Sequence, residues 1–183
     1  MRAGKSWLGK SRVFFLSLSP RLGVEGERMA RAHLTPAEET LFASMSRYDR
    51  AHSLLVARDL GGVRSLVKAA LLHDTGKLRR ELPAWFRICY TGAEIFASHH
   101  LKRAAESLKE RVGQGSSRER LARLERRSDR ALFAQTYHGE LAAEMLEGLG
   151  TELEVVRLVR YHQVIPGSDD EVLIRFIRAD SAF

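Results

Sequence analysis

The stretch Leu71-Leu72-His73-Asp74-Thr75-Gly76-Lys77 places an imidazole, a carboxylate and an ammonium within five residues, directly after an apolar helical run. Polar side chains that follow a buried run are costly to desolvate unless a partner compensates them. A metal ion is such a partner, because neutral imidazole and ionised carboxylate are both good ligands. Lys77 lies three residues beyond Asp74, so it can reach the same place without being a ligand itself. The stretch therefore predicts a candidate metal site at the end of a buried helix.

The composition of the chain indicates a helical domain. Its 183 residues are enough for one domain with a sizeable core. Alternating β-branched runs and hairpin dipeptides are scarce, whereas the helix formers Leu, Ala, Arg and Glu are abundant. We therefore expect an all-α fold, with residues 1–34 as an N-terminal helical arm and residues 35–183 as the main domain.

The single cysteine and the N-terminus bear on the location of the chain. Cys89 alone excludes an internal disulfide and a cysteine-based zinc site, and it fits a reducing cytoplasm, where we expect this chain. Lys5, Lys10 and Arg12 precede or flank the apolar run 13–16, which is far too short to span a bilayer. No small-residue cleavage site of a signal peptide follows it. We expect a packed N-terminal helix there, and a basic segment in peripheral contact with a membrane surface is the alternative.

The net charge of +7 and the pI near 10 favour an anionic partner, which can be a phosphorylated substrate, nucleic acid or acidic lipid. The plain alternative is that most of these basic side chains form a solvated surface. Nucleic acid is not the partner we expect, because acidic residues interrupt the most basic stretch, 118–130. A small phosphorylated substrate remains the leading expectation.

Hydrophobic periodicity and capping residues predict where the helices lie. Thr35 is a predicted N-cap whose capping box Glu38 closes, Ser46 opens a second box, and Thr151 is a predicted N-cap near the C-terminal end. Residues 113–117 are expected to form a loop inside the domain. The expected helices span residues 5–18, 25–32, 36–45, 47–60, 63–74, 81–112 (long or broken), 118–130, 138–149, 152–162 and 173–180.

Five of these helices each direct a residue able to bind metal toward the core, since each such residue shares a helical stripe with apolar neighbours. A single core-facing histidine is more often a hydrogen-bonded core residue than a ligand. Four histidines with two carboxylates are hard to satisfy in an apolar bundle without a shared partner. Metal sites in helical bundles are built in this way, from facing helices. The candidate ligands are His52, His73, Asp74, His138, His162 and Asp180.

The order of these ligands resembles the two-metal branch of the HD superfamily of metal-dependent phosphohydrolases. The resemblance covers the chain from about residue 37 onward, and it includes the string His-Asp-Thr-Gly-Lys at 73–77 with His52 placed 21 residues upstream of His73. The Gly-Tyr-Pro element of the HD-GYP cyclic-di-GMP phosphodiesterases is absent after His162, so that activity is not expected. Size and ligand order look closer to the small HD hydrolases of dinucleoside tetraphosphates and related nucleotides. The resemblance implies an HD-type helical bundle with the metal site among its central helices.

The resemblance also implies roles for individual residues. His52, His73, Asp74 and Asp180 would hold one divalent ion, and Asp74 would bridge to a second ion at His138 and His162. Lys77 would contact the substrate phosphate. Manganese, iron, magnesium and zinc all suit such a set of nitrogen and oxygen ligands, as one ion or two.

Other residues are weaker candidates. Arg79 and Arg80 are candidates for binding substrate phosphates beside Lys77, or they form a solvated helix start. His99 and His100 are alternative extra ligands.

The leading expectation is therefore an enzyme, a phosphohydrolase that cleaves a phosphoester or phosphoanhydride of a small nucleotide by a metal-activated water. The alternative is an HD-fold module that senses a nucleotide without cleaving it. A nucleic-acid-binding helical protein is the third interpretation.

Overall fold

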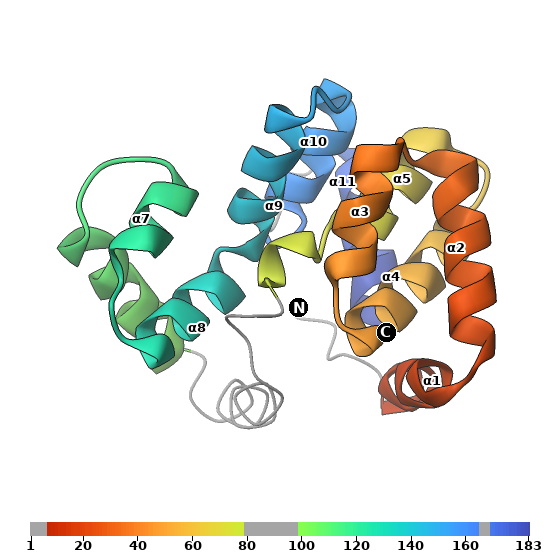
Figure 1. Ribbon diagram of the computed structural model, residues 1–183, viewed down its shortest axis with the longest axis horizontal. Helices are drawn as coiled ribbons and strands as arrows, with labels where there is room; N and C mark the ends of the chain where they lie inside the picture. Colours follow the sequence, from red (N-terminus) through yellow and green to blue (C-terminus); the bar gives the residue numbers. More distant parts are fainter. Residues whose placement is uncertain (1–6, 79–98, 165–168) are drawn as a thin grey trace.

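The computed structural model describes residues 7–78, 99–164 and 169–183, and in these ranges all regular structure is helical (Figure 1). The all-α class is thereby confirmed. No helix in the described part of the chain is long and apolar enough to cross a membrane. The elements are α1 (Trp7–Leu18), α2 (Arg21–His33), α3 (Pro36–Ser44), α4 (Arg47–Leu60), α5 (Arg64–Leu72), the 3-10 turn η1 (Thr75–Lys77), a helical segment over 99–111, α7 (Ser117–Arg123), α8 (Arg127–Thr136), α9 (His138–Gly148), α10 (Leu153–Tyr161) and α11 (Glu171–Ala182).

Most predicted boundaries that fall within the described residues hold within a few residues, and two predictions were wrong. The start of the predicted helix 81–112 lies outside the described residues. The capping box of Thr35 and Glu38 is present, and the Ser46 side chain accepts from the Asp49 amide. The stretch 118–130 is not one helix: α7 ends at Arg123, and the next residue, Leu124, has an extended backbone and a side chain in a buried cluster. Thr151 does not cap α10, because its hydroxyl donates to a distant carboxylate instead.

Two apolar clusters organise the helices. The larger one takes its buried side chains from α1 to α5 and from α9, α10 and α11. The smaller one joins segment 99–111, α7 and α8 to the near side of α9, through residues such as Leu108, Leu121 and Phe133. Helix α9 belongs to both, because Leu141 faces the smaller cluster and Ala142 faces the larger one. In Figure 1 the green helices α7 and α8 therefore lie on the opposite side of α9 from α3 and α5.

The two N-terminal helices share the larger core, and the proposed division at residue 34 stays a prediction. Val13 of α1 and Leu22 of α2 belong to the same cluster as α4 and α5. Helix α1 also crosses the end of α11 at very short distance, since a Cβ atom at Gly9 would lie 2.0 Å from the carbonyl oxygen of Ala182. The first helix of the chain thereby supports the last one.

A buried ionic cluster ties α3, α5 and the start of α10 together. The Glu38 carboxylate accepts the Thr35 amide (2.8 Å), the Lys68 ammonium (2.9 Å) and the Thr151 hydroxyl (2.7 Å). Burial raises the pKa of Glu38, but hydrogen bonds from Thr35, Lys68 and Thr151 outweigh it and leave that pKa below its ordinary value. A residue predicted only as a local cap thus connects three segments far apart in the sequence.

Gly76 sets the distance between η1 and α9. A Cβ atom at this position would lie 2.0 Å from the carbonyl oxygen of His138 and 2.7 Å from the amide nitrogen of Ala142. Only glycine permits this approach without a shift of the backbone. The string His-Asp-Thr-Gly-Lys therefore contains a packing residue as well as candidate ligands.

Replacement of Glu38 by alanine is expected to lower the free energy of unfolding by about 2–4 kcal/mol, because it leaves the buried Lys68 ammonium with a single exposed partner, Glu152. Chemical denaturation measures this. The control is Glu39→Ala in the same first turn of α3, which is expected to cost about 0.5 kcal/mol or less. Equal effects of the two changes would contradict the role of Glu38.

Replacement of Gly76 by alanine is expected to cost about 2–3 kcal/mol of stability, because the new methyl group forces η1 away from α9. Thermal and chemical unfolding measure the loss. Gly148→Ala is the matched control, since a Cβ atom there meets nothing within 4 Å, and it should be neutral or slightly stabilising. A neutral Gly76→Ala variant would disprove the close approach.

Candidate metal centre

The turn after α5 aims His73 and Asp74 sideways out of the helix. His73 keeps helical dihedrals and donates its amide to the Ala69 carbonyl at 2.9 Å. Asp74 follows with φ −92° and ψ 0°, which ends the α-helix and opens η1. The Thr75 hydroxyl donates to the Leu72 carbonyl at 2.7 Å and so satisfies a helix-end acceptor. The local sequence thus stops the helix where the two polar side chains must diverge from its axis.

The structure brings all six candidate ligands together from five helical regions. His52 lies in α4, His138 opens α9, His162 follows α10 directly, and Asp180 lies in the last turn of α11. All six side chains are buried except that of Asp180, which is partly exposed. The shortest separations between their side-chain atoms are His52 Nε2 to Asp180 Oδ1 (2.7 Å), His138 Nε2 to His162 Nε2 (3.1 Å), His73 Nε2 to Asp180 Oδ1 (3.3 Å), His138 Nε2 to Asp74 Oδ1 (3.3 Å) and His73 Nε2 to Asp74 Oδ1 (3.4 Å).

Three of the four imidazoles use one ring nitrogen in the same way. The Nδ1–H group of each donates to the backbone carbonyl three residues earlier: His73 to Ala70 (2.8 Å), His138 to Gln135 (2.7 Å) and His162 to Val159 (2.6 Å). A neutral imidazole has only one N–H group. In its neutral form each of these rings therefore presents an unprotonated Nε2 to the shared space, which is the form that binds a metal.

The pair His138 and His162 shows the consequence. Their Nε2 atoms lie 3.1 Å apart, yet both rings have already used their proton at Nδ1. A hydrogen bond between them would need a second proton on one ring. Burial lowers the pKa of both, and with the charges of His138 and His73 it lowers the pKa of His162 to about 3. Two lone pairs thus face each other, and a cation between them relieves this arrangement.

The Nε2 atom of His73 also lacks a hydrogen-bond partner among the described residues. It is buried, and carboxylate oxygens of Asp74 and Asp180 lie 3.4 and 3.3 Å away. Burial lowers the pKa of His73, but the charges of Asp74 and Asp180 raise it by more, so the net pKa lies above the ordinary value. The surrounding carboxylates thus favour a positive charge at this point.

The separations between donor atoms fit shared ions. Two donors each about 2.1 Å from one ion lie about 3.0–3.4 Å apart at angles between square and tetrahedral. The contacts of 3.1–3.4 Å fall in this range. The ligand atoms form two overlapping groups, His52 with His73 and Asp180, and His73 with Asp74 and His162. The residues present therefore fit one or two divalent ions.

This grouping differs in two respects from the set that the resemblance implies. His138 belongs to neither group, although its Nε2 atom lies 3.3 Å from Asp74 Oδ1 and 3.1 Å from His162 Nε2. His73 belongs to both groups, whereas Asp74 was expected to be the bridging residue. Asp74 reaches toward His138 through the same oxygen, Oδ1, that faces His73. If two ions bind here, both would lie close to His73 and Asp74.

Lys77 occupies the other oxygen of Asp74. Its ammonium donates to Asp74 Oδ2 at 2.6 Å, and its side chain remains 16 % exposed. Burial lowers the pKa of Lys77, but the carboxylates of Asp74 and Asp49 raise it more, so the net pKa lies above the ordinary value. For Asp74, burial raises the pKa, but the charges of His73 and Lys77 outweigh it and bring the pKa well below its ordinary value. Asp74 is therefore an ionised carboxylate held in a fixed orientation.

His52 and Asp180 form the outer part of the centre. The Nε2–H group of His52 donates to Asp180 Oδ1, and burial lowers the pKa of His52. Burial raises the pKa of Asp180, but the hydrogen bond from His52 and the neighbouring His73 ring bring it well below its ordinary value. Phe176, one turn earlier on α11, packs edge-on against the His73 ring at 5.9 Å and closes the apolar side.

The remaining sequence candidates lie elsewhere. His99 and His100 are exposed on segment 99–111 and belong to neither group of ligand atoms. Arg79 and Arg80 lie outside the described residues. Sequence reasoning missed Gly76 as a site residue; its place inside the string 73–77 was the available signal.

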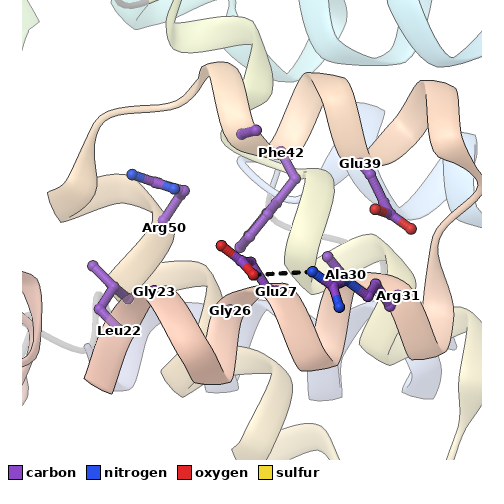
Figure 2. Close-up of a pocket in the computed structure, with 10 residues that line it drawn as sticks. Leu22, Gly23, Gly26, Glu27, Ala30, Arg31, Glu39, Phe42 and Arg50 are labelled. Carbon is purple, nitrogen blue, oxygen red and sulfur yellow. Dashed lines mark hydrogen bonds and ion pairs between the residues drawn. The ribbon is translucent and has the colours of Figure 1, made fainter. Parts of the chain in front are cut away.

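Two surface cavities lie away from the centre. Figure 2 shows one of about 150 Å³ where α2, α3 and α4 meet, with an ion pair between Arg31 and Glu27 beside it. The other, of about 460 Å³, lies between the ends of α2 and α4 and the start of α5. Neither is lined by any of the six candidate ligands, so neither is a substrate pocket for this centre.

Comparisons with known proteins do not extend this description. No family model, no curated protein and no solved structure matches the chain.

Proposed function

We propose that this protein is a metal-dependent phosphohydrolase that cleaves a phosphoester or phosphoanhydride in a small nucleotide. The observation that carries the proposal is the convergence of unprotonated Nε2 atoms and two ionised carboxylates, with the Lys77 ammonium beside them. Divalent ions held by these residues would neutralise phosphoryl oxygens and lower the pKa of a bound water molecule. The ligand order, which resembles that of the two-metal HD phosphohydrolases, supports the same assignment.

The residues of the chain have separate tasks in this proposal. The backbone carbonyls behind His73, His138 and His162 fix the orientation of each ring and the nitrogen that carries its proton. Lys77 fixes the Asp74 carboxylate through Oδ2, so that Oδ1 points toward His73 and His138. The Lys77 ammonium has three N–H donors, and those not used by Asp74 can bind a phosphate oxygen.

The nucleic-acid interpretation loses support from the positions of the arginines. Arg120 and Arg123 donate to backbone carbonyls of the loop before α7, and Arg130 donates to the carbonyls of Leu121 and Leu124. These guanidinium groups hold a loop and a helix end rather than form a free basic surface. A small phosphorylated molecule therefore remains the better substrate class.

Protein purified without chelator is expected to contain about two transition-metal ions per chain, as elemental analysis measures. His52→Gln and His162→Gln each alter one group of ligand atoms, so each variant should retain about one ion. Asp74→Ala should lose metal and turnover together, because the carboxylate faces His73 and His138. His100→Gln, at an exposed imidazole, is the control and should retain the parent's content.

A parent that binds no metal after reconstitution with manganese or iron would overturn the proposal. Full turnover by the Asp74→Ala variant would do the same. Metal binding with tight nucleotide binding but no product would favour the alternative, an HD-fold module that senses a nucleotide.

Lys77→Met is expected to keep its metal but to lower kcat/KM roughly 100-fold, because the ammonium that orients Asp74 and binds the phosphate is lost. The assay uses bis-p-nitrophenyl phosphate and a panel of nucleoside and dinucleoside polyphosphates. Lys102→Met, at an exposed position of segment 99–111, is the control with the same loss of charge. Unchanged turnover in Lys77→Met would remove Lys77 from the mechanism.

A further inference from the structure

Helix α1 has an apolar face that the other described residues, 19–78, 99–164 and 169–183, do not cover. Its opposite face packs into the core through Val13 and through the crossing of Gly9 with the end of α11. At 3.6 residues per turn the uncovered side chains fall within an arc of about 120°, on the side away from Val13. The apolar ones are Leu8 (78 % exposed), Phe14 (52 %), Phe15 (70 %) and Leu18 (65 %), and the exposed, polar Ser11 lies among them.

Such a face is unusual on a free surface. Large apolar patches on a soluble chain ordinarily mark a contact with a membrane or with another protein. In α1 the side chains that face the core are buried, whereas those of the exposed arc are not. We therefore expect a binding partner to cover the exposed arc.

The charge of this region identifies the chemistry of the occupant. Residues 1–24 contain no Asp or Glu but five of the chain's basic residues: Arg2, Lys5, Lys10, Arg12 and Arg21. Lys10 and Arg12 border the exposed arc on its two sides, by the same helical spacing. Long basic side chains can lay their alkyl stems along apolar surface and carry the charge beyond it. Apolar residues flanked by basic ones suit a lipid interface with anionic headgroups.

We propose that the face of α1 formed by Leu8, Phe14, Phe15 and Leu18 docks on an anionic lipid membrane. The helix would lie in the headgroup plane, because its 12 residues extend only about 18 Å, well short of the roughly 30 Å hydrocarbon core. Phe14 and Phe15 would insert among the acyl chains, and Lys10 and Arg12 would contact lipid phosphates. This proposal does not depend on the metal centre.

A second copy of the chain is a poorer occupant for the same face. In a two-fold interface the same patch of each copy faces its equivalent. Lys10 and Arg12 of each copy would then approach one another, and no residue of α1 is acidic. Like charges placed opposite each other oppose association. Anionic lipid, by contrast, supplies the missing negative charge.

Flotation of the full chain with vesicles tests the proposal. Binding is expected to vesicles of phosphatidylcholine with phosphatidylserine, to be absent with phosphatidylcholine alone, and to weaken as salt rises. The double change Phe15→Ser with Leu18→Ser should abolish it. Lys10→Gln with Arg12→Gln should weaken it about thirty-fold. Lys102→Gln with Arg103→Gln removes the same charge from exposed positions of segment 99–111 and should leave binding unchanged.

Three results would overturn the proposal. The first is no flotation with either vesicle, and the second is equal flotation of the parent and the Phe15→Ser/Leu18→Ser variant. The third is a dimer in sedimentation velocity that this variant dissolves, since it would make a second copy the occupant. An unchanged unfolding temperature and metal content in the variants shows that only the exposed face was altered.

Discussion

Six buried or partly buried acceptor-rich side chains share one space, and too few protons are available to pair them. His73, His138 and His162 have each committed their N–H group to a backbone carbonyl, and Asp74 and Asp180 are ionised. Unpaired lone pairs in an apolar core are costly. These side chains come from α4, α9 and α11 and from the residues directly after α5 and α10, and the same helices form the larger core; the proposed metal ion would pair them.

Several contacts outside the centre hold these helices at the required distance. Gly76 lets η1 rest on the backbone of α9, and the Glu38–Lys68 pair with Thr151 ties α3 and α5 to the start of α10. Helix α1 crosses the end of α11, which carries Asp180. One face of α1 therefore packs against α11, which carries a residue of the proposed metal centre. The other face of α1 is the proposed membrane face.

Sequence patterns predicted most of the helices because burial and capping act over a few residues. The Thr35 cap, the Ser46 cap and the inward position of His52 all follow from spacing along one helix. The predictions failed where a residue far away in the sequence determines the local structure. Leu124 breaks the predicted helix 118–130 in order to be buried beside Phe133, and Thr151 gives its hydroxyl to Glu38 across more than a hundred residues of chain.

The sequence by itself determined which side chains point inward and what chemistry they carry, because helical periodicity and side-chain type are local properties. Tertiary structure alone decided that five helices meet at one point and that His73 belongs to both groups of ligand atoms. It also decided that the Lys77 ammonium donates its hydrogen bond to Oδ2 of Asp74 and not to Oδ1. These depend on distances between segments far apart in the chain, and such distances are set by close approaches like that of Gly76 to α9, which no local pattern encodes.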